Sequence, residues 1–196
     1  MSISLLRQTL RRKRRHLSIF SQRQAENAVI FHLQQLTQFK FAQHIGVYLD
    51  AFGEIRTQKI IELCFKLKKN VYLPTICNMN NHLIWVEISA QQYRNKRFFK
   101  HHFGMQQAMR SRGFQPNRLD IMILPLVACD AKGTRIGMGG GFYDRTLANY
   151  PYKPLRLGMA HDFQFVAQPL VTQKWDQALN CLITPKRVIH FKRKIA

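Results

Sequence analysis

A glycine-rich segment, DAKGTRIGMGGGFYDRTL over residues 130–147, carries the strongest chemical signal in the sequence. It follows the most apolar of the strand candidates and leads into a predicted helix at about residues 140–149. Glycines let the backbone adopt positive φ angles and approach a ligand closely. Backbone N–H groups at such a turn can surround phosphate oxygens, and Arg135 can add a forked, charged donor. The segment therefore indicates a phosphate-binding loop.

Spacing alone leaves a second interpretation of this segment open. The P-loop ending GK[ST] is absent, and the dinucleotide pattern GxGxxG fails because Phe142 stands at its third glycine position. The glycines could form a tight turn that only lets a strand and a helix pack. Asp144 just past the loop could hold Mg²⁺, or could simply complement the dipole of the helix. Phe142 and Tyr143 could stack on a ring or fill the core.

Two further groups of charged residues could take part in chemistry. At the N-terminus, Arg7, Arg11 and either Arg14 or Arg15 fall on one side of a predicted helix. That stripe could clamp a triphosphate, or it could be a solvated basic face. Glu54 could accept hydrogen bonds from ligand N–H groups, because an ionised carboxylate is only an acceptor. Its alternative role is a charge at the entry of the next helix.

The elements that must position these residues alternate between helix and strand patterns, which favours an α/β fold. We predict one domain over residues 1–196, with three layers and a mostly parallel central sheet flanked by helices. Ser18 or Ser21 and Thr57 are expected to cap helices. The expected helices span 3–16, from Ser18 or Ser21 to about Phe39, 57–69 and 140–149. The expected strands are His44–Asp50, Asn70–Ile76, Leu83–Ile88, Asp120–Cys129, Leu155–Ala160 and Cys181–Ile189, with Pro125 near a strand end or a break in pairing. Residues 91–119 are expected to form a surface loop with a short helix.

Composition limits the class of protein. Lys and Arg number 31 against 10 Asp and Glu, so the formal net charge is +21, which attracts anions without specifying them. The four cysteines show no metal-binding spacing, and we expect Cys64 and Cys129 to be buried thiols in a reducing compartment. No apolar run approaches the roughly 20 residues that span a bilayer. We therefore expect a cytoplasmic protein that does not enter a membrane.

The sequence RIGMGGGFYDRTL, residues 135–147, resembles the signature of the 5-formyltetrahydrofolate cyclo-ligase family, and ILPLVACDAKG at 123–133 resembles the strand and turn that precede it. The resemblance extends over nearly the whole chain. It implies a reaction in which ATP and 5-formyltetrahydrofolate give 5,10-methenyltetrahydrofolate, ADP and phosphate, through a phosphorylated formyl group (an iminium phosphate). It also implies Mg²⁺ as a cofactor.

The resemblance also implies roles for individual residues. Catalysis falls to Arg135 and Asp144. Folate contacts fall to Leu49, Glu54 and Phe142, and metal contacts to Asp144 and Asp176. The residues implied to bind ATP are Arg7, Arg11, Arg135, Ile136, Gly137, Met138, Gly139, Gly140, Gly141, Phe142 and Tyr143. The sequence departs from the family pattern at Asn180, where an Asp is common, and Trp175 is expected to pack.

The sequence leaves two rival functions open. The first is a basic nucleic-acid-binding protein, favoured by the charge but lacking a recognised motif of that class. The second is a phosphotransferase that uses the same loop on another acceptor. We favour a monomeric enzyme whose partner is a small folate, which could carry a polyglutamate tail, rather than nucleic acid.

Overall fold

The computed structural model describes residues 2–77, 80, 82–100, 106–109 and 112–193. Its α-helices are α1 (Ile3–Arg15), α2 (Ile19–Gln35), α3 (Thr37–Phe41), α4 (Gln58–Lys66), α5 (Ala90–Arg94) and α6 (Phe142–Leu147). Its strands are β1 (His44–Gly46), β2 (Asn70–Ile76), β3 (Leu83–Ile88), β4 (Phe98–Lys100), β5 (Gln106–Ala108), β6 (Gly113–Phe114), β7 (Ile121–Pro125), β8 (Ala128–Cys129), β9 (Arg135–Ile136), β10 (Leu155–Met159), β11 (Cys181–Ile183) and β12 (Val188–His190).

An eight-stranded sheet in the order β12–β11–β10–β7–β1–β2–β3–β6 forms the centre of the fold. The five strands from β11 to β2 run parallel, while β12 and β3 pair antiparallel at the two sides. The predicted α/β class with a mostly parallel sheet is therefore confirmed. β7 lies in the interior of the sheet, as its apolar sequence predicts.

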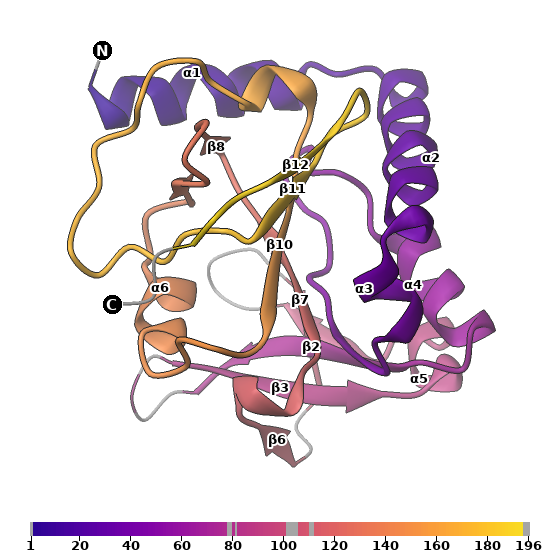
Figure 1. The fold of residues 1–196 in the computed structure, drawn as a ribbon. Coiled ribbons are helices and arrows are strands. Elements are labelled where there is room, and N and C mark those ends of the chain that lie inside the picture. The colour runs from indigo at the N-terminus through magenta and orange to yellow at the C-terminus, as the bar shows by residue number, and fades with distance from the viewer. Residues whose placement is uncertain (1, 78–79, 81, 101–105, 110–111, 194–196) are drawn as a thin grey trace.

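Helices cover both faces of this sheet (Figure 1). On one face, α2, α3 and α4 pack their apolar sides against the strands, with Val29, Phe39 and Ile60 almost fully buried. On the other face, Leu147 of α6 packs with Trp85 and Leu182. The N-terminal helix α1 lies across one end of the sheet, where Leu6 and Leu10 pack on β8 and β9. These layers bear out the prediction of a sheet flanked by helices.

The order of the strands creates a topological switch point between β1 and β7. From β1 the chain crosses through α4 to β2, while from β7 it crosses through α6 to β10, on the opposite face and in the opposite direction. The loops that leave the carboxyl ends of β1 and β7 therefore diverge. In open α/β sheets, ligands bind at such a switch point.

Several elements differ from the sequence prediction. The expected helix up to Phe39 is two helices, because Leu36 adopts an extended backbone (φ −69°, ψ 120°) between α2 and α3. The expected strand Asp120–Cys129 ends at Pro125, and its last residues instead form β8, which pairs with β9. The expected strand Cys181–Ile189 is an antiparallel hairpin of β11 and β12. Ser18 is confirmed as a cap, since its Oγ accepts from the Ser21 N–H.

The segment 91–119 contains more structure than predicted. It includes part of α5, the β4–β5 hairpin and β6, which extends the sheet beside β3. Its residues 101–105 and 110–111 lie outside the described part of the chain. Among the described residues, no helix combines the length and apolar character needed to cross a bilayer.

Candidate active site

The glycine-rich loop leaves a tight β-hairpin and enters α6. The hairpin of β8 and β9 is closed by the buried Asp130, whose Oδ1 accepts from the N–H groups of Lys132 and Thr134. Gly139 has φ +109°, and a Cβ built there would meet no atom within 4 Å. The loop therefore turns a bare stretch of backbone toward open space, as the sequence predicts for a ligand-binding loop. Arg7 Nε of α1 donates to the Gly137 carbonyl at 3.0 Å and ties the loop to this helix.

Arg135 and Asp144 form an ion pair at the two ends of this loop. Arg135 Nη2 lies 2.8 Å from both carboxylate oxygens of Asp144, and the side chains are 3% and 16% exposed. In the part of the chain that the structure describes, the buried Arg135 Nε has no hydrogen-bond partner. The described residues therefore leave one N–H donor of this guanidinium unpaired.

A second network fixes the other side of Asp144. The Gln177 N–H donates to Asp144 Oδ1 at 3.1 Å, and Gln177 Oε1 accepts from Arg156 Nη1 at 2.8 Å. Arg156 is 1% exposed and also donates to the carbonyls of Leu147 and Tyr150, at the end of α6. Burial lowers the pKa of Arg156 to about 10. Arg156 thus ties the helix that carries Asp144 to the segment that carries Asp176.

The loop after β1 forms the opposite wall. The Val47 N–H still pairs with β2, but the chain then folds back on itself and leaves the sheet earlier than predicted. Thr57 Oγ1 donates to the Tyr48 carbonyl at 2.9 Å, and the Thr57 N–H donates to Asp50 Oδ1 at 2.9 Å. Thr57 occupies the N-cap position of α4, as predicted, but its side chain makes no capping hydrogen bond because its hydroxyl closes this loop. The loop presents Leu49 and Glu54.

Glu54 is a buried carboxyl group, 9% exposed. Its Oε2 accepts from the Ala51 N–H at 3.1 Å, and its Oε1 lies 3.6 Å from Arg14 Nη1. Burial raises the pKa of Glu54 to about 7, although the nearby Arg14 acts to lower it. Burial also raises the pKa of Tyr48, whose hydroxyl donates to the Ile55 carbonyl.

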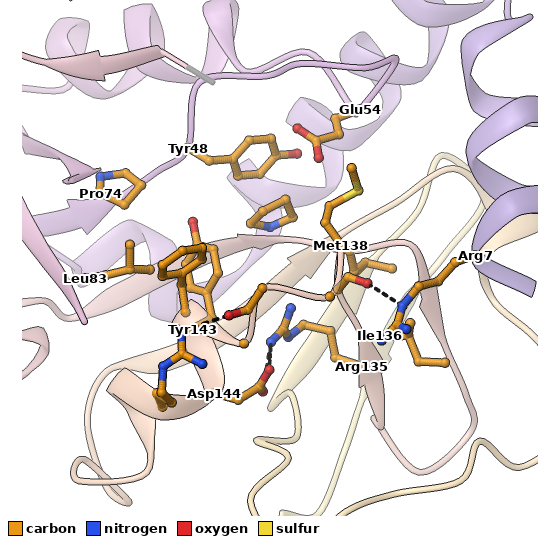
Figure 2. Close-up of a pocket in the computed structure, with 18 of the residues that line it drawn as sticks. Arg7, Tyr48, Glu54, Pro74, Leu83, Arg135, Ile136, Met138, Tyr143 and Asp144 are labelled. Carbon is orange, nitrogen blue, oxygen red and sulfur yellow. Dashed lines mark hydrogen bonds and ion pairs between the residues drawn. The ribbon is translucent and has the colours of Figure 1, made fainter. Parts of the chain in front are cut away.

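The two walls enclose a pocket of about 890 Å³ at the switch point, within the size range of small-molecule sites. Figure 2 shows Tyr48 and Glu54 on one side, Arg135 and Asp144 on the other, and Met138 between them. Every residue predicted for the site lies on its lining: Arg7, Arg11, Leu49, Glu54, Arg135, Ile136, Gly137, Met138, Gly139, Gly140, Gly141, Phe142, Tyr143, Asp144 and Asp176.

Some residues at or behind the pocket were missed or misjudged from the sequence. Trp175 was expected to pack, but it is 63% exposed and lies on the pocket lining. Tyr48 lines the pocket from the end of β1, and Arg145 stacks 5.2 Å from the ring of Phe142. Tyr48 lies in the same predicted strand as Leu49, so its place one residue before a predicted contact was an available signal. No such signal marks Trp175, because it lies in a long segment without regular structure.

The donors for a metal ion are few. Among the described residues, no three His, Cys, Asp or Glu side chains converge as a metal site. Mg²⁺ commonly takes only one or two protein carboxylates and completes its shell with phosphate oxygens and water. Asp144 and Asp176 both line the pocket and fit that mode. The Asp176 Oδ2 accepts from the Gln173 N–H at 2.8 Å.

Comparison with known proteins agrees with the resemblance seen in the sequence. The 5-formyltetrahydrofolate cyclo-ligase from Haemophilus influenzae is 36% identical over 177 residues, which cover 89% of this chain and 92% of that protein. The Escherichia coli protein of the same name is 35% identical over 182 residues, covering 91% of this chain and 98% of that protein.

The NMR structure of 5,10-methenyltetrahydrofolate synthetase from Aquifex aeolicus superposes with a TM-score of 0.81 at 27% identity, over 98% of this chain and 94% of that one. A synthetase of the same name from Mycoplasma pneumoniae shares the fold, with a TM-score of 0.74 at 20% identity over 94% and 99% of the two chains. The family model of the cyclo-ligases matches residues 2–185. This chain therefore belongs to the 5-formyltetrahydrofolate cyclo-ligase family.

Proposed function

We propose that this enzyme uses ATP to cyclise 5-formyltetrahydrofolate to 5,10-methenyltetrahydrofolate, with release of ADP and phosphate. One observation carries the proposal. A single pocket at the switch point of the sheet brings the glycine-rich loop with Arg135 and Asp144 to face the loop that holds Leu49 and Glu54. A phosphoryl donor on the first wall and a folate on the second would then meet in one cavity.

The first wall is suited to a triphosphate. Arg7, Arg11 and Arg135 line it together with bare loop backbone, and guanidinium groups bind phosphate oxygens through paired hydrogen bonds. Asp144 and Asp176 would hold Mg²⁺, which would neutralise charge on the phosphates. The Arg135–Asp144 pair would then loosen as both partners turn to the nucleotide.

The second wall is suited to a flat heterocycle with N–H groups. An ionised Glu54 can accept hydrogen bonds from the amino and ring N–H groups of a pterin. Leu49 and Phe142 supply apolar contacts on the same lining. Because Glu54 titrates near neutral pH, binding of the pterin is expected to strengthen as the pH rises through that range.

The proposed chemistry uses nucleophiles that belong to the substrate. The formyl oxygen attacks the terminal phosphorus of ATP, and ADP leaves, which gives an iminium phosphate. N10 of the folate then attacks the activated carbon and loses its proton, and expulsion of phosphate leaves the methenyl bridge. The protein positions the reactants and stabilises charge.

The proposal is tested by mixing the protein with ATP, Mg²⁺ and 5-formyltetrahydrofolate and following the near-ultraviolet absorbance of the methenyl product. ADP is measured in parallel, with reactions that lack ATP or folate as controls. We expect one ADP for each methenyl group formed. ATP hydrolysis that does not depend on folate, or salt-sensitive binding of RNA without turnover, would contradict it. Polyglutamylated substrate, a monomeric state and a cytoplasmic location remain parts of the proposal.

A further inference from the structure

Arg14 is a buried cation behind the pocket, and the proposed reaction has not used it. It lies near the end of α1, only 1% exposed, and it is not among the described residues that line the pocket. The sequence analysis placed either Arg14 or Arg15 on the stripe with Arg7 and Arg11, which could clamp a triphosphate. The structure instead buries its guanidinium beside Glu54, with Nη1 3.6 Å from Glu54 Oε1.

The contacts of Arg14 join three segments that are distant in sequence. Its Nε donates to the Phe52 carbonyl at 2.9 Å, in the loop that carries Glu54. Its Nη1 donates to the Leu126 carbonyl at 3.2 Å, just beyond β7. Its Nη2 lies 3.9 Å from the sulfur of Met138, in the glycine-rich loop. One rigid guanidinium thus touches both walls and the strand end between them.

The backbone around this contact leaves little room for movement. Gly53 has φ +77°, and a Cβ built there would lie 2.5 Å from the Arg14 carbonyl oxygen, so the loop packs directly on the end of α1. From the other side, His161 Nε2–H donates to the Gly53 carbonyl at 3.1 Å. Burial lowers the pKa of His161, although this hydrogen bond acts to raise it. Arg14 and His161 therefore hydrogen-bond to the backbone carbonyl groups of two successive residues, Phe52 and Gly53.

We infer that Arg14 is a positioning residue for Glu54. It fixes the loop of residues 50–55, which forms the pocket wall opposite the glycine-rich loop, so that the Glu54 carboxylate points into the pocket. Arg14 itself contacts neither substrate. The inference rests on the proposed function, because it assigns Arg14 to the folate side of that reaction. A planar group with several directed N–H donors is needed here, since a lysine could satisfy only part of this set.

Charge gives Arg14 a second effect on the same carboxyl group. The ionisable groups that act on Glu54 or feel its charge are Arg14 from α1, Asp50 from the same loop, Tyr48 from the end of β1 and Tyr143 from α6. Arg14 is the cation of this set and acts to lower the pKa of Glu54. Loss of Arg14 should therefore move the ionisation of Glu54 to higher pH.

The test is steady-state kinetics of Arg14→Met and Arg14→Lys across a range of pH. Arg12→Met serves as a matched control, because Arg12 is an exposed arginine on the same helix. For Arg14→Met we expect the KM for 5-formyltetrahydrofolate to rise roughly tenfold to a hundredfold, the range for loss of a hydrogen-bonded charged group. The KM for ATP should change much less.

The pH profile separates positioning from a general loss of structure. kcat/KM for the folate reports ionisation in the free enzyme, so its midpoint should move to higher pH in Arg14→Met. In Arg14→Lys the midpoint should stay close to that of the wild type, while the KM remains raised. If Arg14→Met does not fold, as judged by circular dichroism, the KM of Arg14→Lys for the folate is the test. A raised KM supports the inference, and an unchanged KM overturns it.

Each outcome distinguishes this inference from the proposed function. If the wild-type protein turns over and the Arg14 variants have the same KM values and pH profile as Arg12→Met, the inference is overturned and the proposed function stands. Equal losses toward ATP and folate, with no shift in the pH midpoint, would also overturn it. Absence of turnover by the wild-type protein would contradict the function itself, and the inference would fall with it.

Discussion

Arg135 Nη2 sits midway between the two carboxylate oxygens of Asp144, 2.8 Å from each. A single nitrogen thus holds both oxygens, while the buried Arg135 Nε has no partner among the described residues. The pair closes the glycine-rich loop at its ends and orients both side chains before a ligand arrives. We therefore expect both activity and stability to depend on this pair, and a substitution in it to change both.

We predict that Asp144→Asn lowers kcat roughly a hundredfold or more, because the amide cannot supply the negative charge that a metal–phosphate complex needs. It should also lower the free energy of unfolding by about 2–3 kcal/mol, since the Arg135 guanidinium then lies buried without its counterion. Turnover at saturating ATP and Mg²⁺ and chemical denaturation measure the two effects. Glu62→Gln, which removes an exposed carboxylate on α4, is the control. A near-normal rate in Asp144→Asn would remove this residue from the proposed mechanism.

A second prediction concerns the bare backbone at Gly139. Its φ of +109° is unfavourable for any residue with a Cβ, although no atom lies within 4 Å of the place such a Cβ would take. Gly139→Ala should therefore cost about 1–3 kcal/mol of stability from the backbone alone. The new methyl group would also stand where we propose the phosphates bind. We expect the KM for ATP to rise about tenfold while the KM for the folate changes little, and equal changes in both would argue against a phosphate site at this loop.

The third prediction uses the two tryptophans, which have opposite environments. Trp85 is 1% exposed in the core, while Trp175 is 63% exposed on the pocket lining. Adding Mg²⁺ and ATP should change the fluorescence of the protein through Trp175, and Trp175→Phe should abolish this change. The substitution should alter the free energy of unfolding by less than about 0.5 kcal/mol, as expected for a surface residue. A full fluorescence response in Trp175→Phe would mean that the added nucleotide does not contact Trp175.

The local parts of the site could be predicted from the sequence. Strand, glycine loop and helix follow one another between Ile121 and Leu147, so their order alone brings Arg135 and Asp144 together. Glu54 was predictable for a similar reason, because it lies just past β1, at the edge where loops of a parallel sheet gather. The alternation of apolar segments likewise indicated the sheet and the helices that cover it.

The parts that could not be predicted depend on contacts between distant segments. α1 carries cations on all sides, and helical spacing cannot tell which of them faces inward. The choice of Arg14 is decided by the carbonyls of Phe52 and Leu126, which lie 38 and 112 residues away in sequence. The early end of β7 has a similar origin, because the backbone of Val127 pairs with Ile136 instead of continuing in the sheet.

The fourth prediction concerns stability and pH at Glu54. Burial raises its pKa from 4.5 to about 7 in the folded protein, so between these values the folded chain holds a proton that the unfolded chain has released. The free energy of unfolding then falls as the pH rises. The stability that protonated Glu54 provides is complete below pH 4.5 and is lost as the pH approaches about 7. The whole change amounts to about 3 kcal/mol, at roughly 1.4 kcal/mol for each pKa unit.

Glu54→Gln removes this titration and keeps a side chain of similar shape. The difference in unfolding free energy between the wild type and Glu54→Gln should therefore fall steadily across the same pH range, whatever other groups titrate there. Chemical denaturation of both proteins at a series of pH values measures this difference. Over the same range kcat/KM for the folate should rise in the wild type, because ionised Glu54 is the form that accepts hydrogen bonds from the pterin. Stability and activity would thus change in opposite directions with pH, and a difference in unfolding free energy that stays constant would show that folding does not raise the pKa of Glu54.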